Sequence, residues 1–96
     1  MLLDEIQQKK EKIKALCHQF GASHVRVFGS VARREETIES DIDILVDFPR
    51  GYDLFKQRLP LSESLQDLLQ RKIDLIPEHE LNKHMRQSIL AEVIEL

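Results

Sequence analysis

The sequence predicts an α/β (α+β) fold, in which a short β-sheet of three to four strands packs against about four helices. Two kinds of segment support this prediction: stretches with apolar residues at helical spacing, and short strand-like runs that alternate with them along the chain. These runs are too few and too short to establish a parallel sheet. A chain of 96 residues that is 42% apolar is small, and such chains bury roughly 60 to 68% of the surface that the unfolded form exposes. We therefore expect residues 1–96 to form a single domain with one modest core.

The N-terminal half predicts one helix and two strands. Residues 2–20 are expected to form an amphipathic helix, because their apolar residues recur at helical spacing and Gly21 follows at the position of a C-terminal cap. Residues 24–28 alternate and are bounded by glycines, which indicates a short strand. A second strand is predicted over residues 42–48, because a turn-forming Pro-Arg-Gly sequence follows it. The apolar residues of the helix are Leu2, Ile6, Ile13, Leu16, Cys17 and Phe20.

A second helical region is predicted over residues 52–71, where leucines recur close to helical spacing. Pro60 interrupts the region, because proline lacks the N–H group that an α-helix needs. We expect either a kink or two helical pieces, the second of which begins near Ser62.

The C-terminal part predicts one more strand and one more helix. Residues 73–76 are expected to form a third short strand, and Pro77 is expected to close it. Apolar residues at helical spacing mark a last helix over residues 81–90. The final segment, residues 93–96, is interpreted as a frayed helix end or as a fourth strand.

Composition excludes several classes of protein. Fourteen basic and 17 acidic side chains give a net charge of −3, which argues against general nucleic-acid binding through electrostatics. A single cysteine, Cys17, cannot form an internal disulfide, and its place on an apolar stripe indicates a buried residue rather than a nucleophile. No apolar run approaches the roughly 20 residues that cross a bilayer, and the charged N-terminus is unlike a secretory signal. We expect a soluble cytoplasmic protein without membrane contact.

The clearest chemical pattern is Gly29-Ser30, followed after ten residues by Asp41 and Asp43. Alternate residues of a strand face the same side, so the two carboxylates project together while the apolar residues between and after them face the core. Adjacent carboxylates repel each other unless a cation lies between them. Carboxylates at this spacing suit Mg²⁺, which one or two carboxylates commonly hold together with substrate phosphates.

Asp74 follows the same alternation in the third predicted strand, where its apolar neighbours face the core. A neighbouring strand could therefore present a third carboxylate to the same pocket. Three converging acids can hold two metal ions about 3.5 to 4 Å apart, as in phosphoryl-type transfer. On the sequence alone, Asp74 is equally well interpreted as a strand-edge acid or as the ion-pair partner of Lys72 or Arg71.

Gly29 and Ser30 stand where a strand ends and a turn begins. Glycine at such a position allows a positive φ and close backbone approach, which leaves N–H groups and the Ser30 hydroxyl available to a phosphate. A helical turn from Val31 onward would add its N-terminal dipole. Arg33 and Arg34 follow one turn later, and each is interpreted either as a phosphate contact or as a solvated side chain.

At these residues the sequence resembles the nucleotidyltransferase superfamily related to DNA polymerase β. The segment FGSVARREETIESDIDILV is similar to the FGSxARGxxxxxSDxDLxV pattern of the minimal nucleotidyltransferases, the antitoxin halves of HEPN/MNT toxin–antitoxin pairs. The segments RKIDLIPEHEL and RQSILAEVIEL also resemble that family, so the likeness covers nearly the whole chain. One departure is Arg34, where the family usually has glycine.

The resemblance implies the minimal nucleotidyltransferase fold, with a short mixed sheet, and a reaction. A hydroxyl, in this family a tyrosine of a HEPN toxin encoded nearby, attacks the α-phosphate of ATP, and pyrophosphate leaves. By resemblance, Asp41, Asp43 and Asp74 are the catalytic residues and ligate Mg²⁺, as two ions, and Asp74 also helps to deprotonate the acceptor. The implied nucleotide-binding residues are Gly29, Ser30, Arg33 and Ser40.

Two other functions remain open on the sequence. The chain could be a non-catalytic antitoxin that neutralises its partner by binding and occluding it. It could also be a small-molecule nucleotidyltransferase of the aminoglycoside-modifying kind, although these normally need a further helical domain that 96 residues cannot encode.

Overall fold

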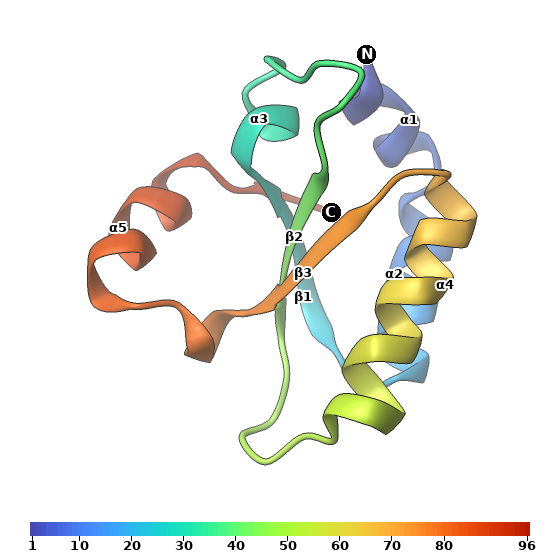
Figure 1. Ribbon diagram of the computed structural model, residues 1–96, viewed down its shortest axis with the longest axis vertical. Coiled ribbons are helices and arrows are strands. Elements are labelled where there is room, and N and C mark those ends of the chain that lie inside the picture. The colour runs from blue at the N-terminus through green and yellow to red at the C-terminus, as the bar shows by residue number, and fades with distance from the viewer.

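The computed structural model describes residues 1–96 and contains one four-stranded mixed sheet (Figure 1). The strands are β1 (Ser23–Phe28), β2 (Ile42–Asp47), β3 (Ile73–Pro77) and β4 (Ile94–Glu95), in the order β3-β2-β1-β4. The pairs β1–β2 and β1–β4 are antiparallel, whereas β2–β3 is parallel. The predicted α/β (α+β) fold with a short mixed sheet is therefore confirmed, and the last segment is a strand rather than a frayed helix end.

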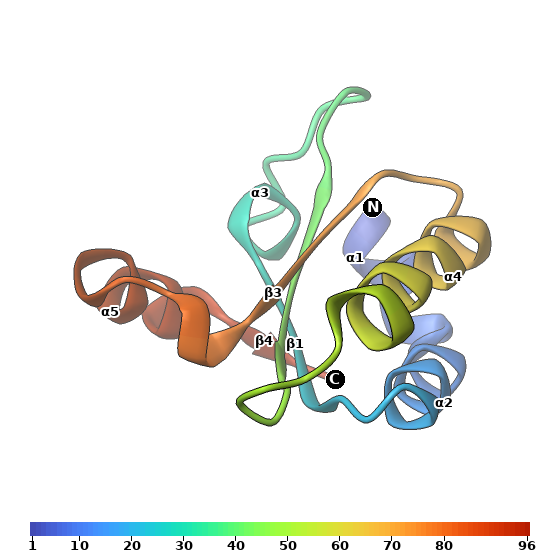
Figure 2. The same cartoon turned by 60° about the horizontal axis from the view of Figure 1, so that its bottom comes forward.

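Three helices cover one face of the sheet and a fourth covers the other (Figure 2). The first group consists of α1 (Leu2–Gln8), α2 (Lys10–Gln19) and α4 (Leu59–Leu69), and α5 (Lys83–Glu92) lies on the opposite side. A single turn of helix, α3 (Gly29–Ala32), follows β1. None of these helices has the length and apolar character needed to cross a membrane.

The single helix predicted over residues 2–20 is wrong, because the structure breaks it at Lys9. Lys9 has a φ of −101° and a ψ of 10°, outside the helical region. Residues 7–12 are all polar, so no apolar side chain fixes a straight helix to the core across this stretch. The two halves therefore pack separately, through Leu2, Leu3 and Ile6 and through Ile13 and Cys17.

The main core lies between the sheet and helices α1, α2 and α4. Strand β2 contributes Ile42, Ile44 and Val46, all fully buried, as the alternation of the sequence predicts. Cys17 is also fully buried, and burial raises the pKa of its thiol to about 12. The thiol therefore stays protonated at neutral pH, which confirms the structural interpretation of this cysteine.

A second, smaller core lies on the other face of the sheet. Leu45 is fully buried there and packs with Phe28 of β1 and Ile89 of α5. The alternation of residues in β2 predicts this face to be polar, and that prediction is wrong at Leu45. The apolar run from Ile44 to Val46 is typical of a strand that is covered on both sides, and β2 is such a central strand.

The boundaries of the two C-terminal helices differ from the prediction by a few residues. A π-helical turn over Leu54–Arg58 leads directly into α4, which begins at Leu59 rather than near Ser62. Pro60 lies in the first turn of α4, where a missing N–H group breaks no intrahelical hydrogen bond. The side chain of Asn82 caps α5 by accepting a hydrogen bond from the Met85 N–H at 2.8 Å, so this helix begins two residues later than predicted.

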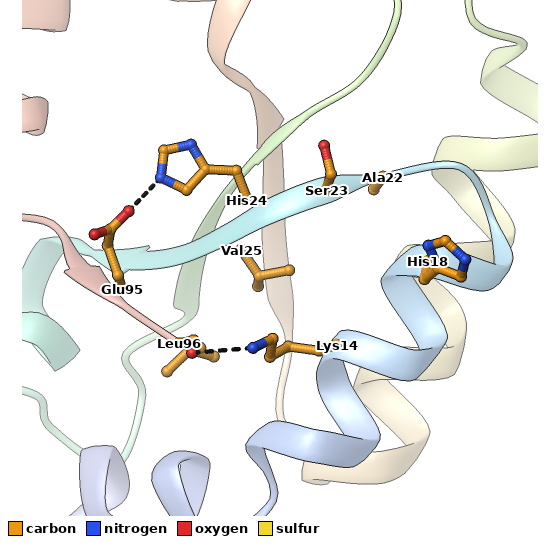
Figure 3. Close-up of a pocket in the computed structure, with 8 residues that line it drawn as sticks. All are labelled: Lys14, His18, Ala22, Ser23, His24, Val25, Glu95 and Leu96. Carbon is orange, nitrogen blue, oxygen red and sulfur yellow. Dashed lines mark hydrogen bonds and ion pairs between the residues drawn. The ribbon is translucent and has the colours of Figure 1, made fainter.

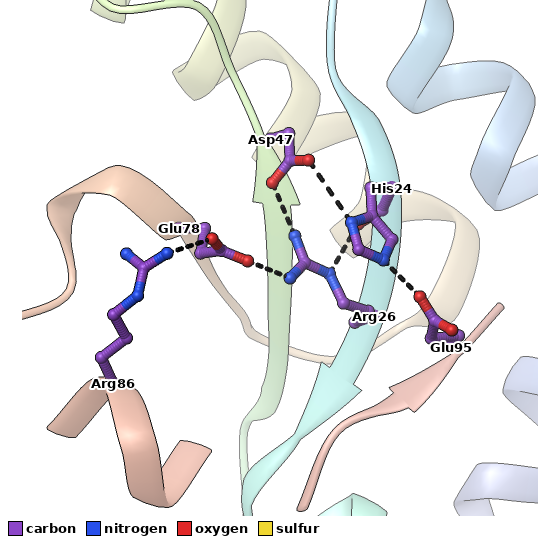
Figure 4. Close-up of polar contacts among 6 residues, drawn as sticks. All are labelled: His24, Arg26, Asp47, Glu78, Arg86 and Glu95. Atoms are coloured by element: carbon purple, nitrogen blue, oxygen red, sulfur yellow. Dashed lines mark hydrogen bonds and ion pairs between the residues drawn. The ribbon is translucent and has the colours of Figure 1, made fainter. Parts of the chain in front are cut away.

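A buried arginine ties together the end of the sheet that is remote from α3 (Figure 4). Arg26 of β1 is only 1% exposed, and its guanidinium donates to Asp47 of β2 at 2.7 Å and to Glu78, which follows β3. The Arg26 Nε also donates to the carbonyl of His24 at 2.8 Å. The His24 ring lies in turn between the carboxylates of Asp47 and Glu95, as Figure 4 shows. This network joins β1, β2 and β4 to the turn that follows β3, and the sequence did not predict it.

Candidate active site

The predicted site residues meet at the upper end of the sheet in Figure 1, beside α3. The strand register pairs Phe28 of β1 with Asp43 of β2, and Asp43 with Asp74 of β3. Gly29 follows Phe28 directly, and Asp41 immediately precedes β2. Because β1 runs against β2 and β2 runs with β3, the end of β1 and the beginnings of β2 and β3 share one edge of the sheet. This edge, which we call the acidic edge, comprises Gly29, Asp41, Asp43 and Asp74.

Gly29 allows the turn after β1 to lie directly against Asp43. Its φ is +73°, a conformation that residues with a side chain rarely adopt. A Cβ atom on Gly29 would lie 2.1 Å from Oδ2 of Asp43, far inside van der Waals contact. The backbone of Gly29 and the carboxylate of Asp43 therefore form one closely packed unit, in which no larger residue fits.

Gly29→Ala is expected to lower the free energy of unfolding by about 2–3 kcal/mol, through backbone strain and the clash with Asp43 together. Gly51→Ala is the matched control, because Gly51 has a φ of +84° and open space around the position of a Cβ atom. Because Gly51→Ala introduces backbone strain without a clash, it should lower the free energy of unfolding clearly less than Gly29→Ala does. Urea unfolding of both variants tests this, and equal costs would contradict the packing of Gly29 on Asp43.

The carboxyl group of Asp43 is the electrostatic centre of the acidic edge. Burial and the negative charges of Asp74 and Asp41 raise its pKa from 3.8 to about 6, with further contributions from a hydrogen bond with Asp74 and from the charge of Glu92. Asp43 is half-buried, whereas Asp74 is exposed. Acids that crowd together without a cation between them raise one another's pKa in this way. The acidic edge is therefore a place where a bound cation would relieve repulsion.

The acidic edge fits Mg²⁺ only with help from a ligand. No three His, Cys, Asp or Glu side chains of the chain converge in a geometry that could hold a metal ion by themselves. Mg²⁺ is commonly bound through one or two carboxylates while phosphates and waters supply the other ligands. The register pair of Asp43 and Asp74 matches that pattern. The residues present therefore fit a magnesium ion that arrives together with a phosphate chain.

Asp43 should make the metal-free protein less stable as the pH rises. The folded-state pKa is about 6 and the ordinary value is 3.8, so its protonated form favours the folded state, and that stability is lost between about pH 4 and pH 7. We expect Asp43→Asn to be more stable than the wild type at pH 7 by about 1 kcal/mol, a figure reduced for the partial exposure of the carboxyl. The difference should vanish near pH 4. Thermal unfolding with a chelator present at both pH values measures it, and a variant less stable at pH 7 would contradict it.

Glu92 is a residue of this site that the sequence did not predict. It accepts hydrogen bonds from two donors, Gly29 and Arg33, that were expected to face a phosphate. Its Oε1 accepts a hydrogen bond from the Gly29 N–H at 3.1 Å, and its Oε2 accepts one from Nη1 of Arg33 at 2.7 Å. Glu92 ends α5, where a carboxylate faces the negative end of the helix macrodipole. That unfavourable placement is the signal in the sequence that could have indicated a separate role for this acid.

Two further predicted residues, Ser30 and Ser40, lie beside the acidic edge and accept hydrogen bonds within the neighbouring turns. The carbonyl of Ser30 accepts from the Glu35 N–H at 2.8 Å, which closes the turn after α3. The hydroxyl of Ser40 accepts instead from the Thr37 N–H at 2.8 Å, so it stabilises the loop before β2. Ser40 therefore already has a structural hydrogen bond that the sequence pattern did not reveal.

The ion-pair interpretation of Asp74 finds no support in its neighbours. Arg71 donates to the carbonyls of Thr37 and Ser40, at 3.1 and 2.8 Å, and not to Asp74. Lys72 uses its carbonyl to accept from the Ile42 N–H at 3.0 Å, which aligns β3 with β2. Asp74 is left facing Asp43 rather than a basic side chain.

Arg34 departs from the family pattern, and the structure shows how the chain accommodates it. Its φ is +59°, a left-handed conformation that favours glycine. The guanidinium pairs with Asp4 of α1 through two contacts, at 3.1 and 3.3 Å. Arginine thus retains the turn that glycine would adopt and adds a contact with the N-terminal helix.

Substitutions at Arg34 should separate backbone strain from the ion pair. Arg34→Gly is expected to unfold at nearly the wild-type temperature, because relief of strain offsets the lost contact. Arg34→Val should unfold about 5 °C lower, because a β-branched residue is strained at positive φ. Thermal unfolding measures both, and equal temperatures for the two variants would show that this turn does not hold its left-handed conformation.

A cavity of about 580 Å³ lies at the other end of β1, away from the acidic edge (Figure 3). Lys14 and His18 of α2 line it together with His24 and Glu95. Figure 3 shows that two of these side chains are engaged within the cavity wall: Lys14 contacts the Leu96 carbonyl at 3.5 Å, and His24 contacts Glu95. None of the predicted site residues lines this cavity. Its size alone therefore does not make it the candidate active site, and the acidic edge carries the chemistry.

Comparison with known proteins agrees with the fold and the acidic edge. Residues 9–96 match the model of the nucleotidyltransferase domain family. The chain belongs to this family of nucleotidyltransferases. More particularly, its fold is that of a minimal nucleotidyltransferase: a solved structure described as a predicted member of that class superposes with a TM-score of 0.87 at 38% identity, covering 100% of this chain and 97% of the other. The resemblance found in the sequence is confirmed.

Curated relatives are similar over nearly the whole chain. The protein adenylyltransferase MntA of Thermococcus cleftensis is 38% identical over 81 residues, which cover 84% of this chain and 81% of that protein. A predicted protein adenylyltransferase of Methanocaldococcus jannaschii is 38% identical over 94 residues, with 96% and 92% coverage. The fold also matches the MNT antitoxin solved with a tri-AMPylated HEPN toxin of Shewanella oneidensis, with a TM-score of 0.70 at 22% identity, covering 93% of this chain and 69% of the other.

Proposed function

We propose that this protein is an antitoxin that transfers AMP from ATP to a hydroxyl group of a HEPN toxin encoded nearby, a tyrosine in particular, with release of pyrophosphate. The observation that carries the proposal is the register of the sheet, which sets Asp43 between Gly29 and Asp74 at one edge. Protein adenylyltransferases among its relatives, and the AMPylated toxin bound to an antitoxin of the same fold, support the choice of donor and acceptor.

The chemistry needs positioning and charge neutralisation more than covalent participation by the protein. The acceptor oxygen forms a bond to the α-phosphorus atom, the bond from that atom to the bridging oxygen breaks, and pyrophosphate leaves with the electron pair. In line with the family resemblance, Asp74 takes the proton from the hydroxyl group, and its exposure leaves it accessible to an arriving acceptor. Gly29, Ser30 and Arg33 hold the phosphate oxygens in this proposal.

Asp41, Asp43 and Asp74 would hold Mg²⁺, as two ions, together with the triphosphate. The ions supply neutralisation of the charge that develops on the phosphate oxygens. The raised pKa of Asp43, caused by burial and by the charges of Asp74 and Asp41, supports this assignment, because a cation restores the charged form of such a carboxyl. We also propose that residues 1–96 act as one domain, since one core cluster includes residues from α1 to β3.

The direct test is incubation of the purified protein with ATP, Mg²⁺ and the HEPN-type protein of the neighbouring gene, followed by intact-mass measurement of that partner. We expect the mass of one or more AMP groups to be added. Replacement of the acceptor tyrosine by phenylalanine should abolish the addition. An unmodified partner that is nevertheless neutralised would overturn the transferase and favour occlusion by binding. Retention of neutralisation in cells by the double variant Asp41→Asn, Asp43→Asn would lead to the same conclusion.

A further inference from the structure

The carboxylate of Glu92 lies at the acidic edge although its helix, α5, packs on the other side of the sheet. Both of its oxygens are engaged there, one by the Gly29 N–H at 3.1 Å and the other by the Arg33 guanidinium at 2.7 Å. The Glu92 side chain is 25% exposed, whereas that of Arg33 is 46% exposed. Glu92 is thus a partly buried anion held by two donors that come from a different part of the chain.

The same two donors belong to the proposed phosphate site. A backbone N–H group has one hydrogen atom, so the Gly29 amide cannot donate a full hydrogen bond to Glu92 and to a phosphate oxygen at once. The Arg33 guanidinium has more donors, but its Nη1 already makes a short ion pair with Glu92. A phosphate chain that uses these groups must therefore displace the carboxylate or share Arg33 with it.

Electrostatics also favours displacement when a phosphate chain arrives. The charge of Glu92 adds to those of Asp41 and Asp74 around Asp43, and a triphosphate would bring further negative charge to the same edge. Within α5 only Ile89 is buried, but Val93, which directly follows Glu92, packs against the same small cluster, and Ile94 pairs with β1. The carboxylate can leave by rotation of the Glu92 side chain about its own bonds, without movement of the helix.

We propose that Glu92 is an internal competitor of the nucleotide: its carboxylate holds Gly29 and Arg33 in the nucleotide-free protein and yields them to the phosphate oxygens of the bound nucleoside triphosphate. This inference rests on the proposed function, because it concerns the same site. It predicts that Glu92 weakens nucleotide binding while it keeps the empty site ordered. Binding then occurs only to the fraction of molecules in which the carboxylate has left, and the apparent affinity equals the intrinsic affinity multiplied by that fraction.

The test compares nucleotide affinity in the wild type and in Glu92→Gln by calorimetry, with Mg²⁺ and an ATP analogue that has a methylene group between its α- and β-phosphorus atoms. This analogue cannot transfer AMP, so binding is measured apart from chemistry. Glutamine keeps the size of the side chain but loses the charge that Arg33 holds. We expect the Kd to fall about five- to tenfold in Glu92→Gln, and at least as far in Glu92→Ala. The affinity for adenosine, which has no phosphate, should not change.

Glu35→Gln is the matched control. Glu35 also pairs with Arg33, with its Oε1 at 3.5 Å from Nε, but it is 67% exposed and does not contact Gly29. Its neutralisation removes the same charge from the same arginine, so a Kd close to that of the wild type is expected. An equal gain in both variants would overturn the proposal, because general charge repulsion would then explain it.

The remaining outcomes separate this inference from the proposed function. Unchanged or weaker binding in Glu92→Gln and Glu92→Ala, with AMP transfer intact in the wild type, would overturn the role of Glu92 alone and show it to be a positioning residue. Tighter binding in both variants without any transfer by the wild type would support the competitor and overturn the transferase. An absence of analogue binding in all variants would overturn both.

Discussion

Asp43→Asn is expected to reduce AMP transfer by about 10³-fold or more while the protein remains folded. The substitution keeps the shape of the side chain but removes the charge at the centre of the acidic edge, where Asp43 contacts Gly29 and pairs in register with Asp74. Loss of a metal ligand explains the loss of transfer, and loss of mutual repulsion explains why the fold should survive. Intact-mass measurement of the partner after a fixed time gives the rate.

The control for this variant is Asp67→Asn, the same change at an exposed position of α4, which should transfer AMP at the wild-type rate. A second readout concerns the metal: Mg²⁺ with the methylene analogue should raise the unfolding temperature of the wild type but not that of Asp43→Asn. An unfolded Asp43→Asn protein would show that Asp43 has chiefly a structural role. Normal transfer by a folded Asp43→Asn protein would remove the basis of the proposed mechanism.

Arg26→Ala is expected to lower the free energy of unfolding by about 3–4 kcal/mol, the largest stability effect of any substitution considered. Arg26 is 1% exposed, and its removal leaves a cavity and takes the cation away from Asp47 and Glu78. Arg26→Met keeps most of the buried stem and should lose less. Urea unfolding at neutral pH measures the difference, and the methionine variant stays informative where the alanine variant does not fold.

Arg86→Ala is the control for Arg26. Arg86 pairs with the same Glu78 at 2.6 Å, but its side chain is 44% exposed, so its loss should cost under about 1 kcal/mol. Equal costs for the two arginines would show that burial does not decide the strength of this network. Wild-type stability of Arg26→Ala would show that the network is dispensable.

The alternation of residues in β2 predicted one buried face of the strand and the side on which Asp43 lies, but not the second buried face around Leu45. Ile42, Ile44 and Val46 are buried as expected, and the strand register brings Asp43 beside Asp74. These predictions succeed because the period of a strand is local and the core imposes it. The mixed character of the sheet came from the resemblance, since nothing in the spacing fixes the direction of neighbouring strands.

Features that join distant segments could not be predicted. The contact of Glu92 with Gly29 and the contact of Arg26 with Glu78 each depend on where α5 and the turn after β3 settle. The sequence also did not predict the break at Lys9 or the start of α4 at Leu59. Helix ends depend on the balance between the packing of side chains and the helix propensity of the residues, and the sequence pattern does not fix that balance. The residue types in the sequence therefore indicated the chemistry of the site, but not the contacts that distant segments make with it.

The shortness of β4 has a consequence for how the fold opens. Its two residues pair with β1 from the far end of the chain, through Arg26 with Glu95 and Val27 with Ile94. Ordering this C-terminal segment costs conformational entropy, and a strand of two residues supplies few contacts that compensate for it. The segment of α5 and β4 should therefore detach by local unfolding while the rest of the sheet persists. In native-state hydrogen exchange, the Leu96 amide, which donates to Val25 at 3.0 Å, should lose protection well before the amides of β2. The same excursion would carry Glu92 away from Gly29 and leave the phosphate end of the site transiently uncovered.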